Sequence, residues 1–313
     1  MKIITVTLHP AIDKVIETKR IIPNESCRAR IKMIYGGGKG NNVARALTRL
    51  NIAVIATGFQ GGYTGEYITT ALKNEGIHTE FVFCQAPTRT STIILEEDTG
   101  DSYAVYEPGQ NIQIDEASQL LSKVIDLSLD ASLILLCGSG QYPALEYIYY
   151  DIILMAKERN IRCLLDSSGL ALKNGISAKP YMVKVNQHEL SDYFQRPLVH
   201  LNDQLNALNE LHQSGISVVA MSRGADGLIV TDGKEFYEAK LSMTKTIFTV
   251  GAGDSLLAGF AKALVEGCQI DELARLGVAC GTANTQVTGA GFITSELVNQ
   301  LLPKVKIRKI YFY

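Results

Sequence analysis

The stretch LILLCG, residues 133–138, is a continuous apolar run that ends in a glycine. Three later stretches are also largely apolar, and each ends in a polar residue: CLLDSS at 163–168, MVKVN at 182–186 and SVVAMS at 217–222. Strands buried on both faces of a parallel sheet have this character, because helices cover both faces. Ligands gather outside the carboxyl ends of such strands, so each polar strand end is a candidate binding position.

The N-terminal part of the chain alternates strand patterns with helical patterns. A strand pattern at 2–8 is followed by a helical one at 39–50, and a second pair follows at 53–59 and 64–75. This alternation is typical of βαβ units and predicts an α/β protein with a parallel sheet. The length of 313 residues fits one large domain, so we expect a single domain spanning 1–313.

Two segments break this rhythm. In RARIKMIY, residues 28–35, the alternation places Ile31, Met33 and Tyr35 on one face, as in a sheet with its other face exposed to water. TIILEEDTGDSYAVYE, residues 92–107, has the pattern of two strands joined by a turn. We expect a small antiparallel sheet laid over the main domain, built from segments at approximately 11–35 and 81–108. It would serve as a lid or a dimerisation surface; a hairpin without function is the alternative.

Composition and charge exclude several classes of protein. Hydrophobic residues make up 46% of the chain and charged residues 20%, as in an ordinary soluble protein. The net charge of −2 offers no basic field to a polyanion, so we expect no nucleic-acid partner. The six cysteines include no CxxC pair, which is typical of thiols in a reducing cytosol. No apolar run has the length of a membrane span or the form of a signal peptide, so we expect no membrane partner and a cytoplasmic location.

A glycine-rich stretch, YGGGKGNNVARAL at 35–47, precedes an amphipathic helical pattern. Glycines let the backbone approach a ligand closely, and a helix N-terminus favours an anion. The stretch is not a GxxxxGK[ST] phosphate loop, because Gly40 follows Lys39. No strand-linked GxGxxG is present, so a dehydrogenase would lack its dinucleotide fingerprint. Taken alone, the stretch is either a ligand-binding loop or a tight turn between a strand and a helix.

The stretch TVGAGDS, residues 249–255, places two glycines and an aspartate where a helix from about Ala252 to Glu266 is predicted. First-turn amides of such a helix are free to bind negative charge. Asp254 could simply cap the helix, at about 0.5–2 kcal/mol, but a cap does not require flanking glycines. In phosphoryl transfer, amides stabilise the moving phosphoryl group while a carboxylate accepts the proton of the attacking hydroxyl. The stretch therefore favours phosphoryl transfer.

Four stretches occur in one order along the chain: GGKGNNVARAL, KVNQHEL, SRGADG and TVGAGDS. Together they resemble the signatures of the ribokinase-like (PfkB-type) carbohydrate kinases, and within them the phosphosugar branch that contains 1-phosphofructokinase and tagatose-6-phosphate kinase. The similarity covers essentially the whole chain, from TVTLHPAID to GVACGTANTQ. It implies a ribokinase-like three-layer α/β sandwich with a mostly parallel central sheet and a small antiparallel β lid.

The resemblance also implies a role for each matching residue. Asp254 would be the catalytic base, and the amides of Gly251, Ala252 and Gly253 would form the anion hole. The residues expected to hold the acceptor sugar are Asp13, Gly37, Gly38, Asn42 and Ser139. A sugar that already carries a phosphate needs fixed positive charge, and arginine suits phosphate through its two-pronged geometry. The residues expected to clamp that phosphate are Arg28, Lys39 and Arg89; for each, a solvated surface side chain is the alternative.

The nucleotide side of the site is assigned in the same way. The residues expected to bind ATP are Lys184, Asn186, Ser222, Gly224, Gly227 and Asn284. Asn186 and Glu189 match the Asn-x-x-Glu pair of the family, which is expected to organise Mg²⁺, largely through water. A plain hairpin turn is the alternative for the glycine loop, and a need for a monovalent cation stays open.

The sequence departs from the family pattern in three places. His9 stands in LHP where relatives usually have LNP, and we interpret it as a core or surface histidine. The loop GSGQYPA, 138–144, replaces the usual GSLPPG but keeps Ser139, which leaves the acceptor open. Val185 stands where proline is common. None of these changes touches the Gly-Ala-Gly-Asp stretch.

The resemblance implies an enzyme that phosphorylates a ketohexose phosphate with ATP and Mg²⁺. Fructose 1-phosphate is favoured as the acceptor, giving fructose 1,6-bisphosphate, and tagatose 6-phosphate, giving tagatose 1,6-bisphosphate, is the alternative. A kinase for a free sugar, or a sugar-phosphate sensor without turnover, comes next, although an intact Asp254 argues against the sensor. The expected partners are ATP, a sugar phosphate and a second copy of the chain in a homodimer formed through the lid sheet.

Overall fold

The computed structural model describes residues 2–140, 142–242 and 246–311. Its main sheet contains ten strands: β1 (Lys2–Thr7), β4 (Val54–Gln60), β5 (His78–Phe83), β8 (Ala131–Cys137), β9 (Arg162–Asp166), β10 (Met182–Asn186), β11 (Val218–Ser222), β12 (Leu228–Thr231), β13 (Phe236–Lys240) and β14 (Lys306–Ile310). They lie in the order β14-β13-β12-β11-β10-β9-β8-β1-β4-β5. Every neighbouring pair from β11 to β5 is parallel, and the pairs from β11 to β14 are antiparallel. The predicted mostly parallel central sheet is confirmed.

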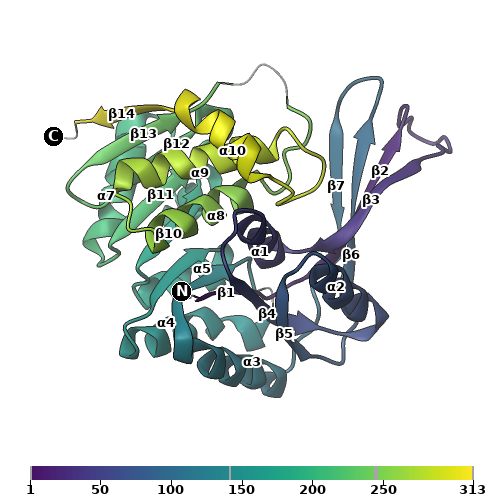
Figure 1. Ribbon diagram of the computed structural model, residues 1–313, viewed down its shortest axis with the longest axis horizontal. Coiled ribbons are helices and arrows are strands. Elements are labelled where there is room, and N and C mark those ends of the chain that lie inside the picture. Colours follow the sequence, from purple (N-terminus) through teal and green to yellow (C-terminus); the bar gives the residue numbers. More distant parts are fainter. Residues whose placement is uncertain (1, 141, 243–245, 312–313) are drawn as a thin grey trace.

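Helices cover both faces of this sheet (Figure 1). One layer consists of α3 (Ile114–Leu127), α4 (Ile148–Glu158), α5 (Gly169–Ser177), α6 (Gln187–Phe194) and α7 (Leu201–Gln213). The other layer consists of α1 (Lys39–Arg49), α2 (Gly62–Asn74), α8 (Ala252–Val265), α9 (Ile270–Asn284) and α10 (Ser295–Leu301). Successive strand residues enter different cores: Ile134 packs in the first layer and Leu135 in the second. This explains the continuous apolar runs, and the predicted three-layer sandwich is confirmed.

A second, four-stranded sheet projects from the main body (Figure 1). Its strands are β2 (Ala11–Thr18), β3 (Arg30–Gly37), β6 (Arg89–Glu96) and β7 (Ser102–Tyr106), in the order β3-β2-β6-β7. We call it the lid sheet. The pairs β2–β3 and β6–β7 are antiparallel, as predicted, but the central pair β2–β6 is parallel. The second lid segment starts at Arg89 rather than near 81, because residues 81–83 belong to β5 in the main sheet.

The prediction that Ile31, Met33 and Tyr35 share one face of β3 is correct only for the two residues nearer the main body. Tyr35 is buried and Met33 is partly buried, but Ile31 is 58% exposed. The register shifts between Val15 and Ile16, so that Val15 pairs with Met33 and Ile16 pairs with Ile31. Such a bulge moves the following side chain to the opposite face of the sheet. Ile31 therefore lies on the outer face, which strict alternation in the sequence could not predict.

None of the helices in the described part of the chain has the length and apolar character needed to cross a membrane.

Candidate active site

The candidate active site forms where the N-termini of α1 and α8 meet. The two helices pack against each other, and the side chain of Asn42 in α1 donates from Nδ2 to Oδ2 of Asp254 in α8 at 2.8 Å. Asp254 is only 7% exposed. Burial raises the pKa of its carboxyl group, while the charge of Lys39 and the hydrogen bond from Asn42 act in the opposite direction. A buried carboxylate with a raised pKa is suited to accept a proton.

Two glycines shape the start of α8, where the amide of Ala252 bonds to the carbonyl of Thr249 at 3.2 Å. Gly251 occupies the N-cap position with φ 83°, a left-handed conformation, and a Cβ there would lie 2.3 Å from Cβ of Ala290. A Cβ on Gly253 would lie 3.0 Å from Nζ of Lys184. Gly251 is the N-cap residue, and the Asp254 carboxylate bonds to Asn42. This geometry argues against Asp254 as a simple helix cap.

Two lysines share one buried carboxylate beside these amides. Nζ of Lys39 lies 2.9 Å from Oδ1 of Asp166, and Nζ of Lys184 lies 2.7 Å from Oδ2. Asp166 is 1% exposed, and the two lysines hold its pKa below the usual range although burial opposes them. The two ammonium groups are held side by side at the carboxyl ends of the strands, where they could meet the phosphates of a nucleotide.

Asp166 was missed in the sequence analysis, although it ends the apolar run CLLD at the carboxyl end of β9. An acid in that position was the available signal. Lys39, expected in the clamp for the sugar phosphate, lies instead with Lys184 and within 3.8 Å of Glu189, on the predicted nucleotide side. Arg28 is also displaced from its predicted place in a lid strand. It is exposed, precedes β3, and its carbonyl accepts a hydrogen bond from Thr18 at the far end of the lid.

The predicted sugar-binding residues converge at the base of the lid sheet. Asp13 is 6% exposed, and a Cβ on Gly37 would lie 2.0 Å from its Oδ2, so only glycine fits beside this carboxylate. Burial raises the pKa of Asp13 to about 7, against the opposing charges of Arg45 and Arg89. Arg89 also donates to the carbonyl of Glu107 at 2.9 Å. Gly38 has φ 103° and links β3 to α1.

The register of the lid explains this convergence. Asp13 pairs with Tyr35 on one side and Ser91 on the other, and Ser91 pairs with Tyr106. Residues in one such row point to the same face of a sheet. Tyr106 is 58% exposed, yet partial burial raises its pKa, and the charges of Asp13 and Asp254 add to the rise. The sequence analysis did not single out Tyr106, since pairing partners are not visible in a sequence.

The altered loop and His9 lie on the same side of the site. Ser139 follows β8, and Gly138 beside it donates to the carbonyl of Asp166 at 2.8 Å. His9 is buried and packs edge-on against Tyr142, with ring centroids 6.1 Å apart. Burial and, to a smaller extent, Arg89 lower its pKa to about 4, so it is neutral near pH 7. Gln141 of this loop lies outside the described residues.

The Asn-x-x-Glu pair forms the N-terminal cap of α6. The amide of Glu189 donates to Oδ1 of Asn186 at 2.8 Å, and the amide of Asn186 donates to Oε2 of Glu189 at 2.7 Å. Oε1 of Glu189 faces Lys39. No group of three or more His, Cys, Asp or Glu side chains suited to a metal exists among the described residues. Mg²⁺ would fit here only with water and substrate phosphates as its main ligands, which is how magnesium is often held.

The remaining nucleotide-side residues divide into two groups. Ser222 ends β11, and Gly224 and Gly227, with φ 58° and 81°, form the turn into antiparallel β12. Asn284 is fully buried: it donates to the carbonyl of Val250 and accepts from Ser255 and the amide of Gly291. Its side chain therefore holds the turn before α8, and its predicted contact with the nucleotide stays a prediction.

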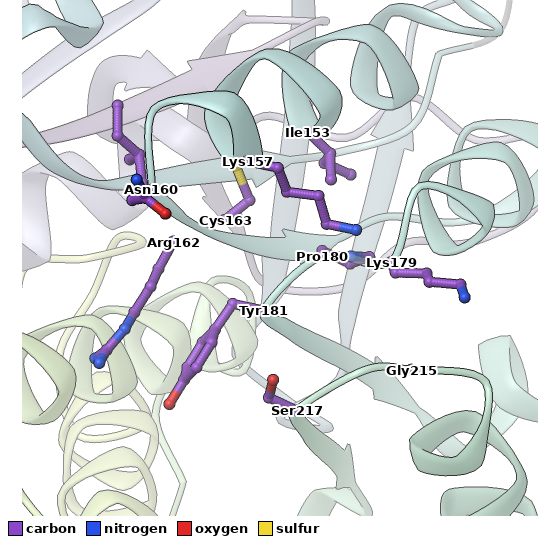
Figure 2. Close-up of a pocket in the computed structure, with 11 residues that line it drawn as sticks. Ile153, Lys157, Asn160, Arg162, Cys163, Lys179, Pro180, Tyr181, Gly215 and Ser217 are labelled. Atoms are coloured by element: carbon purple, nitrogen blue, oxygen red, sulfur yellow. The ribbon is translucent and has the colours of Figure 1, made fainter.

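A separate pocket of about 300 Å³ lies at the amino ends of the parallel strands, away from the carboxyl ends that carry the candidate site (Figure 2). Arg162, Tyr181 and Ser217, which line it, stand at the amino ends of β9, β10 and β11. Two of its three cations have internal partners, because Lys157 donates to the carbonyl of Ala178 and Arg162 lies over the ring of Tyr181. The pocket is distinct from the candidate active site.

A buried carboxylate in the first turn of a glycine-capped helix, with two lysines beside it, is the arrangement expected of a phosphotransferase that acts on a hydroxyl group. The profile of the pfkB family carbohydrate kinases matches residues 11–297. A 1-phosphofructokinase of Bacillus subtilis strain 168 is 33% identical over 308 residues, which cover 98% of this chain and 100% of that protein. A tagatose-6-phosphate kinase of Staphylococcus epidermidis strain RP62A is 28% identical over 311 residues, covering 98% and 100%.

The structural comparison agrees with this result. The crystal structure of phosphofructokinase-2 from Escherichia coli in complex with substrates and products is 30% identical, with a TM-score of 0.91. The match covers 97% of this chain and 99% of that one. The chain belongs to the pfkB family of carbohydrate kinases.

Proposed function

We propose that the protein transfers the terminal phosphoryl group of ATP to a ketohexose phosphate, with fructose 1-phosphate as the acceptor and fructose 1,6-bisphosphate as the product. The position of Asp254 carries this proposal. Its carboxylate is buried, held by Asn42 on one oxygen, and placed in the first turn of a glycine-capped helix. In this arrangement Asp254 accepts the proton of the attacking hydroxyl while the amides of Gly251, Ala252 and Gly253 stabilise charge on the phosphoryl group.

The acceptor would bind at the base of the lid sheet. Asp13 and the Gly37–Gly38 backbone offer hydrogen-bond partners for sugar hydroxyls, and Arg89 offers a cation beside them. This cation supports an acceptor that already carries a phosphate. The likeness to the Bacillus subtilis 1-phosphofructokinase favours fructose 1-phosphate. The likeness to the Staphylococcus epidermidis kinase keeps tagatose 6-phosphate as the alternative.

The nucleotide would lie along the carboxyl ends of β9, β10 and β11. Lys39 and Lys184 would meet its phosphates, and the glycine turn 224–227 would lie beside its other end. Mg²⁺ would be held by Glu189 and the Asn186 cap through water, and it would neutralise charge on the phosphates when bound. The need for a monovalent cation is a separate question for the same assay.

A homodimer through the lid sheet is the assembly we propose. On the outer face of the lid, one row across all four strands is apolar: Ile31, Ile16, Ile94 and Tyr103. Ile31 and Tyr103 are 58% and 43% exposed, and the nearby Val105 is 56% exposed. An exposed apolar stripe of this kind is typical of a protein–protein contact, and a two-fold axis would pair it with itself. Arg28, at the far end of the lid, could then reach a sugar phosphate only in the site of the second copy.

An ATP-consumption assay with a panel of acceptors tests the proposal. The panel is fructose 1-phosphate, tagatose 6-phosphate, fructose 6-phosphate, free fructose and ribose. We expect the highest kcat/KM with fructose 1-phosphate. Turnover with the free sugars alone would remove the role of Arg89, and tight binding of a sugar phosphate without ADP formation would identify a sensor.

A further inference from the structure

Arg45 in α1 is a fully buried arginine that the proposed mechanism does not use. It is 1% exposed, and its guanidinium lies beside the rings of Tyr35 and Phe292, 5.1 and 4.5 Å from their centroids, while the two rings contact each other edge-on. It forms an ion pair with Glu75, the C-cap residue directly after α2. Apolar residues of similar volume are often at least as stable as a buried ion pair, so its burial calls for a reason other than stability.

The first contact of Arg45 connects it, through Asn42, to the proposed catalytic base Asp254. Nη1 of Arg45 lies 3.2 Å from Oδ1 of Asn42, and the other end of that amide donates to Asp254 at 2.8 Å. A guanidinium has only donors, so the atom that faces it must be the amide oxygen. The amide nitrogen of Asn42 is thereby directed at the Asp254 carboxylate. With the amide reversed, its oxygen would face the carboxylate and repel it.

The second contact leads to the anion hole. Nη1 of Arg45 also donates to the carbonyl of Ala290 at 3.1 Å. Cβ of Ala290 fills the space where a side chain on Gly251 would stand, and the next amide, of Gly291, donates to Asn284. Asn284 in turn holds the carbonyl of Val250, directly before the glycine turn. Arg45 is therefore connected to both sides of the position where the phosphoryl group would move.

The third contact leads to the lid. Nη2 of Arg45 donates to the carbonyl of Gly36 at 2.6 Å, one residue before the Gly37 that packs on Asp13. The charge of Arg45 also opposes the rise in the pKa of Asp13. One side chain thus joins the base, the anion hole and the acceptor site.

We propose that Arg45 is a positioning residue for phosphoryl transfer: it sets the orientation of the Asn42 amide toward Asp254 and fixes the 289–291 turn against the Gly251 amide. This inference rests on the proposed function. Arg45 touches neither substrate in this scheme, and it acts only through Asn42, Ala290 and Gly36.

The test compares Arg45→Lys with Arg49→Met. Lysine keeps the charge but carries its donors on one nitrogen, so it lacks the spread of the guanidinium fork, which reaches Asn42 and Ala290 from Nη1 and Gly36 from Nη2. Arg49 stacks on the same Phe292 ring, at 4.9 Å, one turn further along α1, so its variant controls for packing. We expect Arg45→Lys to lower kcat about 100-fold, as misplaced catalytic groups do, with the KM for ATP nearly unchanged. Arg49→Met should keep both values.

The pH profile separates positioning from general loss of stability. Asp254 must be ionised to act, and the hydrogen bond from Asn42 lowers its pKa. If the amide loses its orientation, that pKa rises, and the acid limb of kcat moves to higher pH in Arg45→Lys. Glu75→Gln, which loosens the guanidinium without removing it, should move the limb in the same direction by less. If Arg45→Lys does not fold, this second variant decides.

Several results would overturn the inference. They are an unmoved acid limb in Arg45→Lys and Glu75→Gln, an equal shift in Arg49→Met, or a crystal structure of Arg45→Lys with Asn42 and the 289–291 turn unchanged. The crystal structure needs no turnover, so it tests the inference even if the protein phosphorylates none of the panel sugars. A lack of turnover with every panel sugar would contradict the proposed function and not this inference.

Discussion

Asn42 and Asp254 are 212 positions apart in the chain, and their side chains meet at 2.8 Å in the interior of the protein. The amide of Asn42 occupies one carboxylate oxygen of Asp254, which leaves the other for the proton of a substrate hydroxyl. This pairing gives Asp254 its proposed role as a base.

Replacing Asp254 by Asn should reduce kcat by about 10²–10⁴-fold, because the proton acceptor is lost while the shape is kept. Binding of ATP, measured by calorimetry, should change little, since Lys39 and Lys184 still pair with Asp166. A variant with a near-normal rate of ADP formation would show that Asp254 has only a structural role.

Gly251→Ala should impair catalysis far more than Gly267→Ala. Both glycines flank α8 with positive φ, 83° and 73°, so each alanine adds about 1–2 kcal/mol of backbone strain. Only at Gly251 would the new Cβ meet Ala290, at 2.3 Å, whereas nothing lies within 4 Å at Gly267. We expect the larger loss of thermal stability in Gly251→Ala, because the contact with Ala290 adds to the backbone strain, and a loss of kcat only in that variant. Equal kcat values would contradict the anion hole.

The KM for the acceptor should depend on pH with a midpoint near the pKa of Asp13, which burial raises to about 7. The ionised carboxylate accepts hydrogen bonds from sugar hydroxyls, and protonation removes part of this capacity. The KM should therefore rise as the pH falls below 7, while Asp13→Asn should have a high KM that does not change with pH. A flat profile in the unaltered protein would exclude Asp13 from sugar binding.

Asp13 also predicts the sign of a stability change. Its folded pKa, about 7, lies above the value for an unfolded chain, so the folded state binds more protons between the two values. Stability should therefore decrease as the pH rises through this window to about 7. Urea unfolding of Asp13→Asn should show a weaker decrease over the same range; an identical slope would mean that other groups cause it.

Asp166→Asn should destabilise the protein by about 3–5 kcal/mol, because two ammonium groups lose their shared buried partner. The exposed pair Lys240–Asp226 offers a control, since Asp226→Asn should change the free energy of unfolding far less than Asp166→Asn does. Urea unfolding measures both. A small effect at Asp166 would mean that water or anions already screen Lys39 and Lys184.

Ile31→Lys should weaken the proposed homodimer by placing a charge in the apolar row of the lid. Ile114→Lys is the control, because Ile114 is 78% exposed but lies at the start of α3, away from the lid. Sedimentation velocity should show monomers for Ile31→Lys and dimers for the control. Dimers of equal strength in both variants would exclude the lid as the contact.

Local patterns in the sequence were enough to predict the mostly parallel sheet and the separate lid, and they single out TVGAGDS as a candidate site. Apolar runs such as 133–138 report burial on both faces directly, and the glycines around Asp254 report a backbone that must approach other atoms closely. Periodicity and glycine spacing are local properties, so they can be recognised without knowing the partners.

The folded structure was needed to see which residues contact one another. It placed Lys39 with Asp166 rather than with Arg89, moved Arg28 to the far end of the lid, and used Asn284 inside the protein. It also turned Ile31 outward through a bulge. These relations depend on strand register and on contacts between segments far apart in the chain. The free energy of such contacts comes from burial and charge pairing across elements, which no single stretch of sequence contains.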